Sequence, residues 1–132
     1  MAIKNNNTSL REIPNPSFYA LYFSVAPEFQ VTPQDKTVLE GQNISFHCSI
    51  SGVPRPNVLW SFSGGSLPSH IVKHDNLFLY NVRNNPSYEG NYTCTGASVA
   101  GRTDYTASLT IHSKYTVMLK QISNIKNFQL VL

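Results

Sequence analysis

Two cysteines and two aromatic residues, spaced at defined intervals, constrain the fold of this chain more than any other feature. Trp60 follows Cys48 by twelve residues, and Tyr92 precedes Cys94 by two. In a structure of two β-sheets, Cys48 and Cys94 can bridge the layers and Trp60 can pack against the bridge. Tyr92 can return its hydroxyl group to the backbone at the start of its strand. A bridge over a loop of this length would stabilise the fold by roughly 4 kcal/mol.

The segments around these residues alternate apolar and polar side chains with the period of a β-strand, so each has one buried face. The apolar positions are Ile44, Phe46, Cys48, Val58, Trp60, Phe62, Ala107, Leu109 and Ile111. Glycine, proline, asparagine and serine separate these strands and favour turns at 39–42, 52–56, 63–66 and 84–86. Short strands with regular turns predict an all-β sandwich or barrel.

The length and charge of the chain argue against nucleic-acid binding and against insertion into a membrane. A chain of 132 residues is expected to form one domain. Ten Lys and Arg against seven Asp and Glu give a net charge of +3, without a basic run. Nucleic acid is therefore not an expected partner. No apolar stretch approaches the roughly 20 residues that cross a bilayer, so we expect no direct membrane insertion.

Residues 1–26 allow two interpretations. An apolar segment at 18–23 precedes the small residues 24–26, which have the spacing of a signal-peptidase site. Glu12, Pro14 and Pro16 interrupt the approach, which favours a disordered extension instead.

Residues 113–132 are also ambiguous. Leu119, Ile122 and Ile125 recur every three residues, as on a helix, whereas residues 128–132 alternate as in a strand. We expect this tail to be atypical, either because the natural protein continues beyond it or because it is a splice product.

Five segments carry a resemblance to a known family. They are PEFQVTPQDKTVLEGQNISFHC (27–48), GVPRPNVLW (52–60), LFLYNV (77–82), GNYTC (90–94) and YTASLTIH (105–112). Together they resemble an immunoglobulin domain of the I-set over residues 27–112. Such domains occur in tandem in neural adhesion receptors, in matrix proteins such as hemicentin and peroxidasin, and in sarcomeric scaffolds such as titin. The resemblance implies an immunoglobulin-like β-sandwich of two antiparallel sheets.

The resemblance also assigns roles to single residues. It makes Cys48 and Cys94 the inter-sheet disulfide, Trp60 the core tryptophan and Tyr92 the corner tyrosine. The inward residues of the fifth strand are Leu77, Leu79 and Val82, and the turn glycines are Gly41 and Gly101.

The chain departs from the family pattern at three positions, one of which is Ser98, where asparagine is frequent. Tyr88 stands where an aspartate usually ties down the turn before the corner tyrosine, unless Glu89 substitutes for it. Gly96 occupies a position where alanine is frequent.

Catalytic constellations are missing from the sequence. His70 and His74 are predicted on one strand about 13 Å apart, too far for joint metal ligation. His47 and Cys48 are adjacent, so their side chains should point to opposite faces. We therefore expect no enzyme activity in this domain, no metal and no cofactor.

Two N-glycosylation sequons lie within the predicted sandwich, at Asn43 and Asn91, and two more lie at Asn6 and Asn7. Strand alternation places Asn43 and Asn91 outward, so each can accept a glycan without disturbing the core. The two sites should flank the end from which the tail leaves.

The sequence predicts a secreted or cell-surface module that binds protein partners, homophilic or heterophilic, in tandem with other domains. Contact is expected at the end away from the glycans, with Arg55, Arg102 and Asp104 as candidate residues, or at unshielded sheet edges. One alternative is a cytoplasmic sarcomere-like scaffold domain with reduced cysteines. Another is an accessory domain of a larger receptor kinase or matrix peroxidase.

Overall fold

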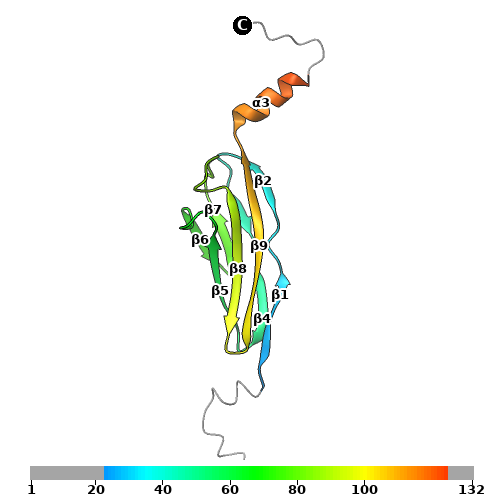
Figure 1. Cartoon of the computed structure of the whole chain (residues 1–132), viewed down its shortest axis with the longest axis vertical. Helices are drawn as coiled ribbons and strands as arrows, with labels where there is room; N and C mark the ends of the chain where they lie inside the picture. The colour runs from blue at the N-terminus through cyan, green and yellow to red at the C-terminus, as the bar shows by residue number, and fades with distance from the viewer. Residues whose placement is uncertain (1–22, 125–132) are drawn as a thin grey trace, which may run out of the picture.

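The computed structural model describes residues 23–124 and shows a β-sandwich followed by one helix (Figure 1). The elements are β1 (Val25–Val31), β2 (Lys36–Leu39), β3 (Ile44–Phe46), β4 (Ser49–Val53), β5 (Asn57–Phe62), β6 (His70–Lys73), β7 (Asn76–Leu79), β8 (Gly90–Ser98), β9 (Gly101–His112) and α3 (Lys114–Ser123). The expected apolar N-terminal segment lies outside the described residues, except for Phe23. The Asn6 and Asn7 sequons, Ile125 and the alternating end also lie outside them.

One layer of the sandwich is the four-stranded sheet β2-β9-β8-β5. The other layer consists of the pair β1-β4 and the sheet β3-β7-β6. All pairings are antiparallel except β2 with β9, which is parallel. The expected antiparallel arrangement holds for the other pairings, and β2 is a parallel strand at this edge. The chain crosses from β1 in one layer to β2 in the other while keeping its direction, and Asp35 holds the crossing by accepting a hydrogen bond from the Ser108 N–H at 2.8 Å.

The strand that carries Cys48 is interrupted. We expected one continuous strand through Ile44, Phe46 and Cys48, but regular pairing stops after Phe46 and resumes at Ser49. At the gap the Cys48 N–H donates to the side-chain carbonyl of Asn76 at 3.0 Å, which replaces a partner strand. The alternation continues across the gap, because Phe46 and Cys48 are both buried.

The core lies between the layers around the disulfide Cys48–Cys94. Tyr92 stacks on Phe46 and Phe62, with ring centroids 5.2 and 4.6 Å apart. The other buried apolar residues include Ile50, Trp60, Leu77, Leu79, Val82, Ala107, Leu109 and Ile111. Offset aromatic contacts of this kind add to the stability that comes from burial of apolar surface.

The turn before β8 is fixed by two side chains. The Tyr92 hydroxyl donates to the backbone carbonyl of Tyr88 at 2.5 Å. Glu89 accepts a hydrogen bond from the Ile111 N–H at 2.7 Å and so ties the turn to β9. Glu89 therefore supplies the carboxylate that is missing at position 88, one residue later than the family pattern places it.

Gly96 makes room for the opposite layer. A Cβ atom at this position would lie 2.5 Å from Cδ1 and 2.9 Å from Cγ2 of Ile50. Ile50 is itself buried in the core. Glycine stands here in place of the family's alanine because the Ile50 side chain packs against β8 at this position.

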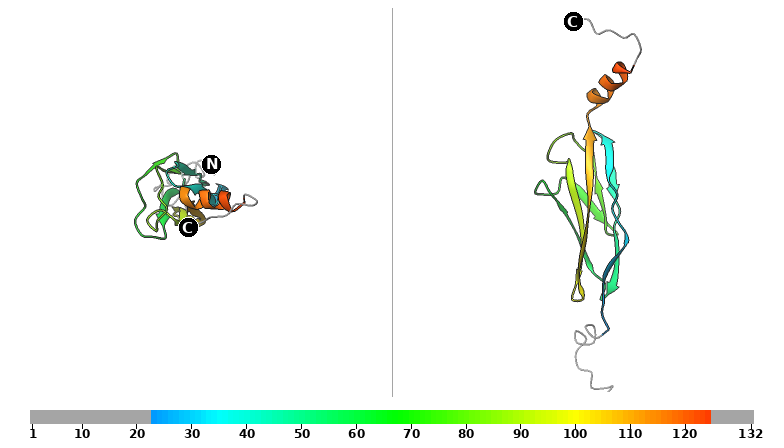
Figure 2. Two further views of the ribbon diagram at one scale, coloured as in Figure 1. Left: turned by 90° about the horizontal axis from the view of Figure 1, so that it is seen from above. Right: turned by 45° about the vertical axis from the view of Figure 1, so that its right-hand side comes forward.

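The chain enters and leaves the sandwich at opposite ends, as Figures 1 and 2 show. Val25 pairs with Val53 at one end, near the β8–β9 hairpin. At the other end the backbone of Glu40 donates to His112, the last residue of β9, and α3 follows. The helix predicted from the spacing of Leu119 and Ile122 is confirmed, and the Leu119 side chain is exposed. Within residues 23–124, no helix is both long and apolar enough to cross a membrane.

We expect Gly96→Ala to destabilise the fold by about 1–3 kcal/mol, because the new methyl group overlaps Ile50. Ile50→Val removes Cδ1, the closer of the two atoms, and should restore part of this loss in the Gly96→Ala background. In the native background the same change should cost about 1 kcal/mol. Chemical denaturation of the two single variants and the double variant measures the coupling. Additive effects would contradict the packing described.

A second prediction concerns alkaline pH. Burial raises the pKa of the Tyr92 phenol well above its usual value, and Tyr88 raises it further. The unfolded chain loses this proton near pH 10 while the folded chain keeps it, so stability is full below pH 10 and falls as the pH rises above about 10. The native protein should lose up to about 1.4 kcal/mol per pH unit more than Tyr92→Phe does. Equal slopes in denaturation between about pH 8 and 11.5 would rule this out.

Candidate functional site

Two ion pairs involve arginines whose backbones lie toward the sandwich end away from α3. Arg55, in the loop between β4 and β5, is 3.6 Å from Asp75, and Arg102 on β9 is 3.5 Å from Asp104. The Arg55 side chain is 84% exposed and the Arg102 side chain is 68% exposed. Exposed pairs of this kind contribute little to stability. The two guanidinium groups are therefore accessible to a partner at little structural cost.

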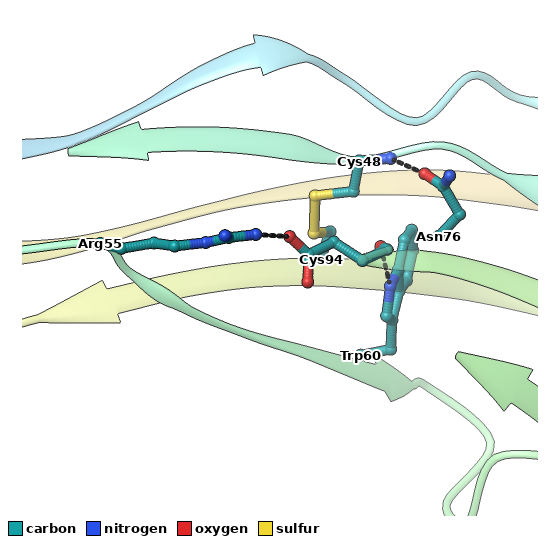
Figure 3. Close-up of a disulfide and its surroundings, with 6 residues drawn as sticks. Cys48, Arg55, Trp60, Asn76 and Cys94 are labelled. Carbon is teal, nitrogen blue, oxygen red and sulfur yellow. Dashed lines mark hydrogen bonds and ion pairs between the residues drawn. A yellow bond between two sulfur atoms is a disulfide. The ribbon is translucent and has the colours of Figure 1, made fainter. Parts of the chain in front are cut away.

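Asp75 is a residue that the sequence analysis missed. Its carboxylate pairs with Arg55, and its backbone carbonyl accepts the Trp60 Nε1–H at 2.9 Å, as Figure 3 shows for the labelled Arg55 and Trp60. The buried indole of Trp60 thereby fixes the β6–β7 turn, which holds the carboxylate beside Arg55. The Asp75-Asn76 dipeptide between two apolar segments was the available signal, because both residue types favour turns.

Two shallow grooves flank the Arg55–Asp75 pair. One, of about 410 Å³, lies between Val31 on β1 and His74 in the β6–β7 turn. The other, of about 610 Å³, runs along the first half of β5 beside Asn57, Val58 and Leu59. Both are lined by Arg55 and Asp75. Leu59 is 71% exposed at the second groove.

The histidines are dispersed. His70 lies on β6 and its Nδ1 is 2.8 Å from the Pro68 carbonyl oxygen. The prediction that His74 shares this strand was wrong, because β6 ends at Lys73 and His74 has a φ of 51°. A left-handed residue at this point turns the chain into β7. Among residues 23–124, no group of three His, Cys, Asp or Glu side chains is placed to hold a metal ion.

His47 and Cys48 do not form a nucleophile and base. Cys48 is bonded to Cys94 and buried, whereas His47 is exposed, with its Nε2 3.4 Å from the Ser45 hydroxyl. The thiolate that nucleophilic catalysis requires is thus not available at Cys48 while the disulfide is intact.

Asn43 lies at the end from which α3 leaves. Its side-chain carbonyl accepts the backbone N–H of Asn81 at 2.9 Å, and Asn81 has a φ of 50°. The hydrogen bond uses Oδ1, so Nδ2, the atom that carries an N-linked glycan, is not consumed by it. The side chain is exposed. Asn43 thus combines a local structural contact with an accessible amide nitrogen.

Asn91 lies at the start of β8 and is also exposed. Its backbone pairs with Ser63, while the Thr93 hydroxyl of the same sequon lies 2.7 Å from that of Thr106. Asn91 is opposite Ser108, near the end of β9. Asn43 and Asn91 therefore lie toward the α3 end on different layers, whereas Arg55 and Arg102 lie toward the other end.

Comparisons with known proteins agree with this architecture. The family model for the immunoglobulin domain matches residues 26–98. The peroxidasin homolog of Homo sapiens is 32% identical over 100 residues, which are 73% of this chain and 7% of that protein. The chain thus spans less than a tenth of this relative's length.

Two solved structures are similar as well. The sidekick-1 immunoglobulin domains 1–5 match with a TM-score of 0.62 and 27% identity, over 69% of this chain and 20% of that one. Titin domain M7 matches with a TM-score of 0.61 and 27% identity, over 68% of this chain and 97% of that one. The family match, the sandwich and the disulfide across its layers lead to one conclusion: this chain belongs to the immunoglobulin domain family.

Proposed function

We propose that this domain is a non-catalytic protein interaction module of a secreted or cell-surface protein, with the domain spanning residues 27–112. The observation that carries the proposal is the combination of a cross-layer disulfide with two exposed sequon asparagines. Disulfides persist in oxidising compartments, and N-glycans are added on the secretory route. A disulfide at Cys48 and a glycan on Asn91 would each require the secretory route, through unrelated chemistry.

The positions of the chain ends support a tandem arrangement. The chain enters beside the β8–β9 hairpin and leaves at the opposite end after β9 (Figure 1). Domains connected in this way can follow one another end to end without reversing the chain. The sidekick-1 structure, which the chain resembles, contains five immunoglobulin domains.

The charges and the sequons favour one end for partner contact. Glycans on Asn43 and Asn91 would shield the α3 end on both layers. The opposite end presents Arg55, Arg102 and Asp104 beside the two grooves. We propose that a protein partner contacts this end or the adjoining sheet edges, where guanidinium groups can bind carboxylates and backbone carbonyls. No cofactor is required for this mode of binding.

A second candidate is an intracellular scaffold domain. The similarity to titin domain M7, which the chain nearly covers, favours it. In that setting the cysteines would stay reduced and the sequons unused. An accessory role beside a catalytic domain is a third candidate, because the peroxidasin homolog is far longer than this chain.

Expression of the whole chain in animal cells tests the first candidate against the second. We expect protein in the medium that loses mass with glycosidase and gains about 2 Da on reduction. Asn43→Gln and Asn91→Gln should each abolish one glycan, since each removes the acceptor amide of a sequon. The measurement is the intact mass of the purified protein.

Asn57→Gln provides the matched control, because Asn57 is exposed but lies outside any sequon. Its glycan mass should equal that of the native chain. An intracellular product with free thiols and no glycan would refute the extracellular proposal and favour the scaffold.

A further inference from the structure

β5 is a terminal strand with an open side. Within residues 23–124 it pairs only with β8, at the end of the order β2-β9-β8-β5. Ser63 shows which residues of β5 bond to β8, because its N–H donates to the Asn91 carbonyl at 2.9 Å. Antiparallel strands alternate between residues that bond to the neighbour and residues whose backbone groups point away. The N–H and C=O groups of Val58 and Trp60 therefore point to the open side of β5.

A hydrogen bond outside the β5–β8 pairing agrees with this alternation of backbone groups. Phe62 should also point away from β8, and its carbonyl accepts the Gly65 N–H at 3.2 Å instead. The chain thus covers the open side at Phe62 with its own turn. At Val58 and Leu59 the same side borders the groove of about 610 Å³.

The features that usually protect sheet edges are absent from β5. Native edges carry charged residues or proline, which prevent pairing with a second strand. Accordingly, β1 contains Pro27 and Glu28, and β6 contains Lys73. The sequence of β5, NVLWSF, has neither a charge nor a proline.

We propose that β5 pairs with β5 of a second copy of this chain, antiparallel about a two-fold axis at Leu59. In this register Val58 faces Trp60 of the second copy, and the two residues exchange N–H···O bonds in both directions. Leu59 faces Leu59 of the second copy in a non-bonded pair, with Cβ atoms about 5 Å apart. The two four-stranded sheets become one continuous sheet.

The two halves of β5 make this pairing self-complementary. The groove lies beside the first half, next to Arg55 and Asn57, and the covering turn lies at the second half, after Phe62. A two-fold axis at Leu59 brings the turn of each copy to the groove of the other. Asn57 then faces Ser61 of the second copy, two uncharged polar side chains that can form hydrogen bonds. Self-pairing brings no like charges together along the strand.

This inference rests on the proposed interaction module and names its partner as a homophilic one. The α3 end is the end where both sequons lie, and the opposite end adjoins the incoming chain. β5 runs along the side of the sandwich between these ends, so it stays accessible when domains follow one another in a row.

Sedimentation velocity and amide exchange on the oxidised whole chain test the proposal. Association should appear as the concentration rises to about 1 mM, because an interface this small gives weak binding. The Val58 and Trp60 amides should become protected with concentration. The Leu59 and Ser61 amides, which point to β8, should be protected at all concentrations.

Leu59→Lys should weaken association by at least about tenfold, because two ammonium groups would meet at the axis. Ile71→Lys is the matched control: Ile71 is 53% exposed on β6, the edge of the other layer, and its change should leave association within about twofold. Val58→Pro is a second test: it removes an N–H that points away from β8 and should weaken association, although it also replaces a side chain that packs against the core. Denaturation of the monomer then separates the loss of packing from the loss of association.

Three results would overturn the inference: a monomer at about 1 mM, association insensitive to Leu59→Lys, or protection confined to other strands. If any of these results is obtained with protein that is disulfide-bonded and glycosylated, the proposal of an extracellular module still stands. A reduced and unglycosylated cellular product would refute that module, whichever way the association measurement came out.

Discussion

The bridge between Cys48 and Cys94 is the constraint on which the other features of this domain depend. It joins the two layers at the middle of the sandwich, where Trp60 packs and where Tyr92 stacks on its aromatic neighbours. Trp60 needs an acceptor for its indole N–H because it is buried, and Asp75 supplies one from the β6–β7 turn. The position of the Arg55–Asp75 pair therefore follows from the hydrogen bond of a core residue.

The sandwich has two distinct ends and two open sides, and each has a different chemical character. Both exposed sequon asparagines lie toward the end that continues into α3, and the opposite end carries the exposed arginines Arg55 and Arg102. Charged residues or proline mark the edges at β1 and β6. β5 lacks both and borders a groove. In the proposed interaction module, this distribution favours partner binding away from α3 and toward the β5 side.

Much of the fold could be predicted from the sequence, because strand alternation is a local pattern. The buried and exposed positions of β5 and β9 follow it, and Tyr92 is buried where the corner pattern placed it. Local alternation is insufficient where a distant residue replaces a regular partner. Asn76 bonds to Cys48 and interrupts its strand, and the crossing at Asp35 makes β2 parallel to β9. His74 ends β6 by adopting a left-handed conformation, which local alternation does not reveal.

The sequence by itself determined the family, the inward-facing residues and the outward position of both sandwich sequons. The family follows from motifs at fixed spacings along the chain. The inward and outward positions follow from alternation along single strands. Only the tertiary structure decided that Gly96 accommodates Ile50, that Asp75 accompanies Arg55, and that one side of β5 is open. These features arise between segments that are far apart in the chain. Their geometry depends on how the layers pack, and no local pattern of residue types encodes it.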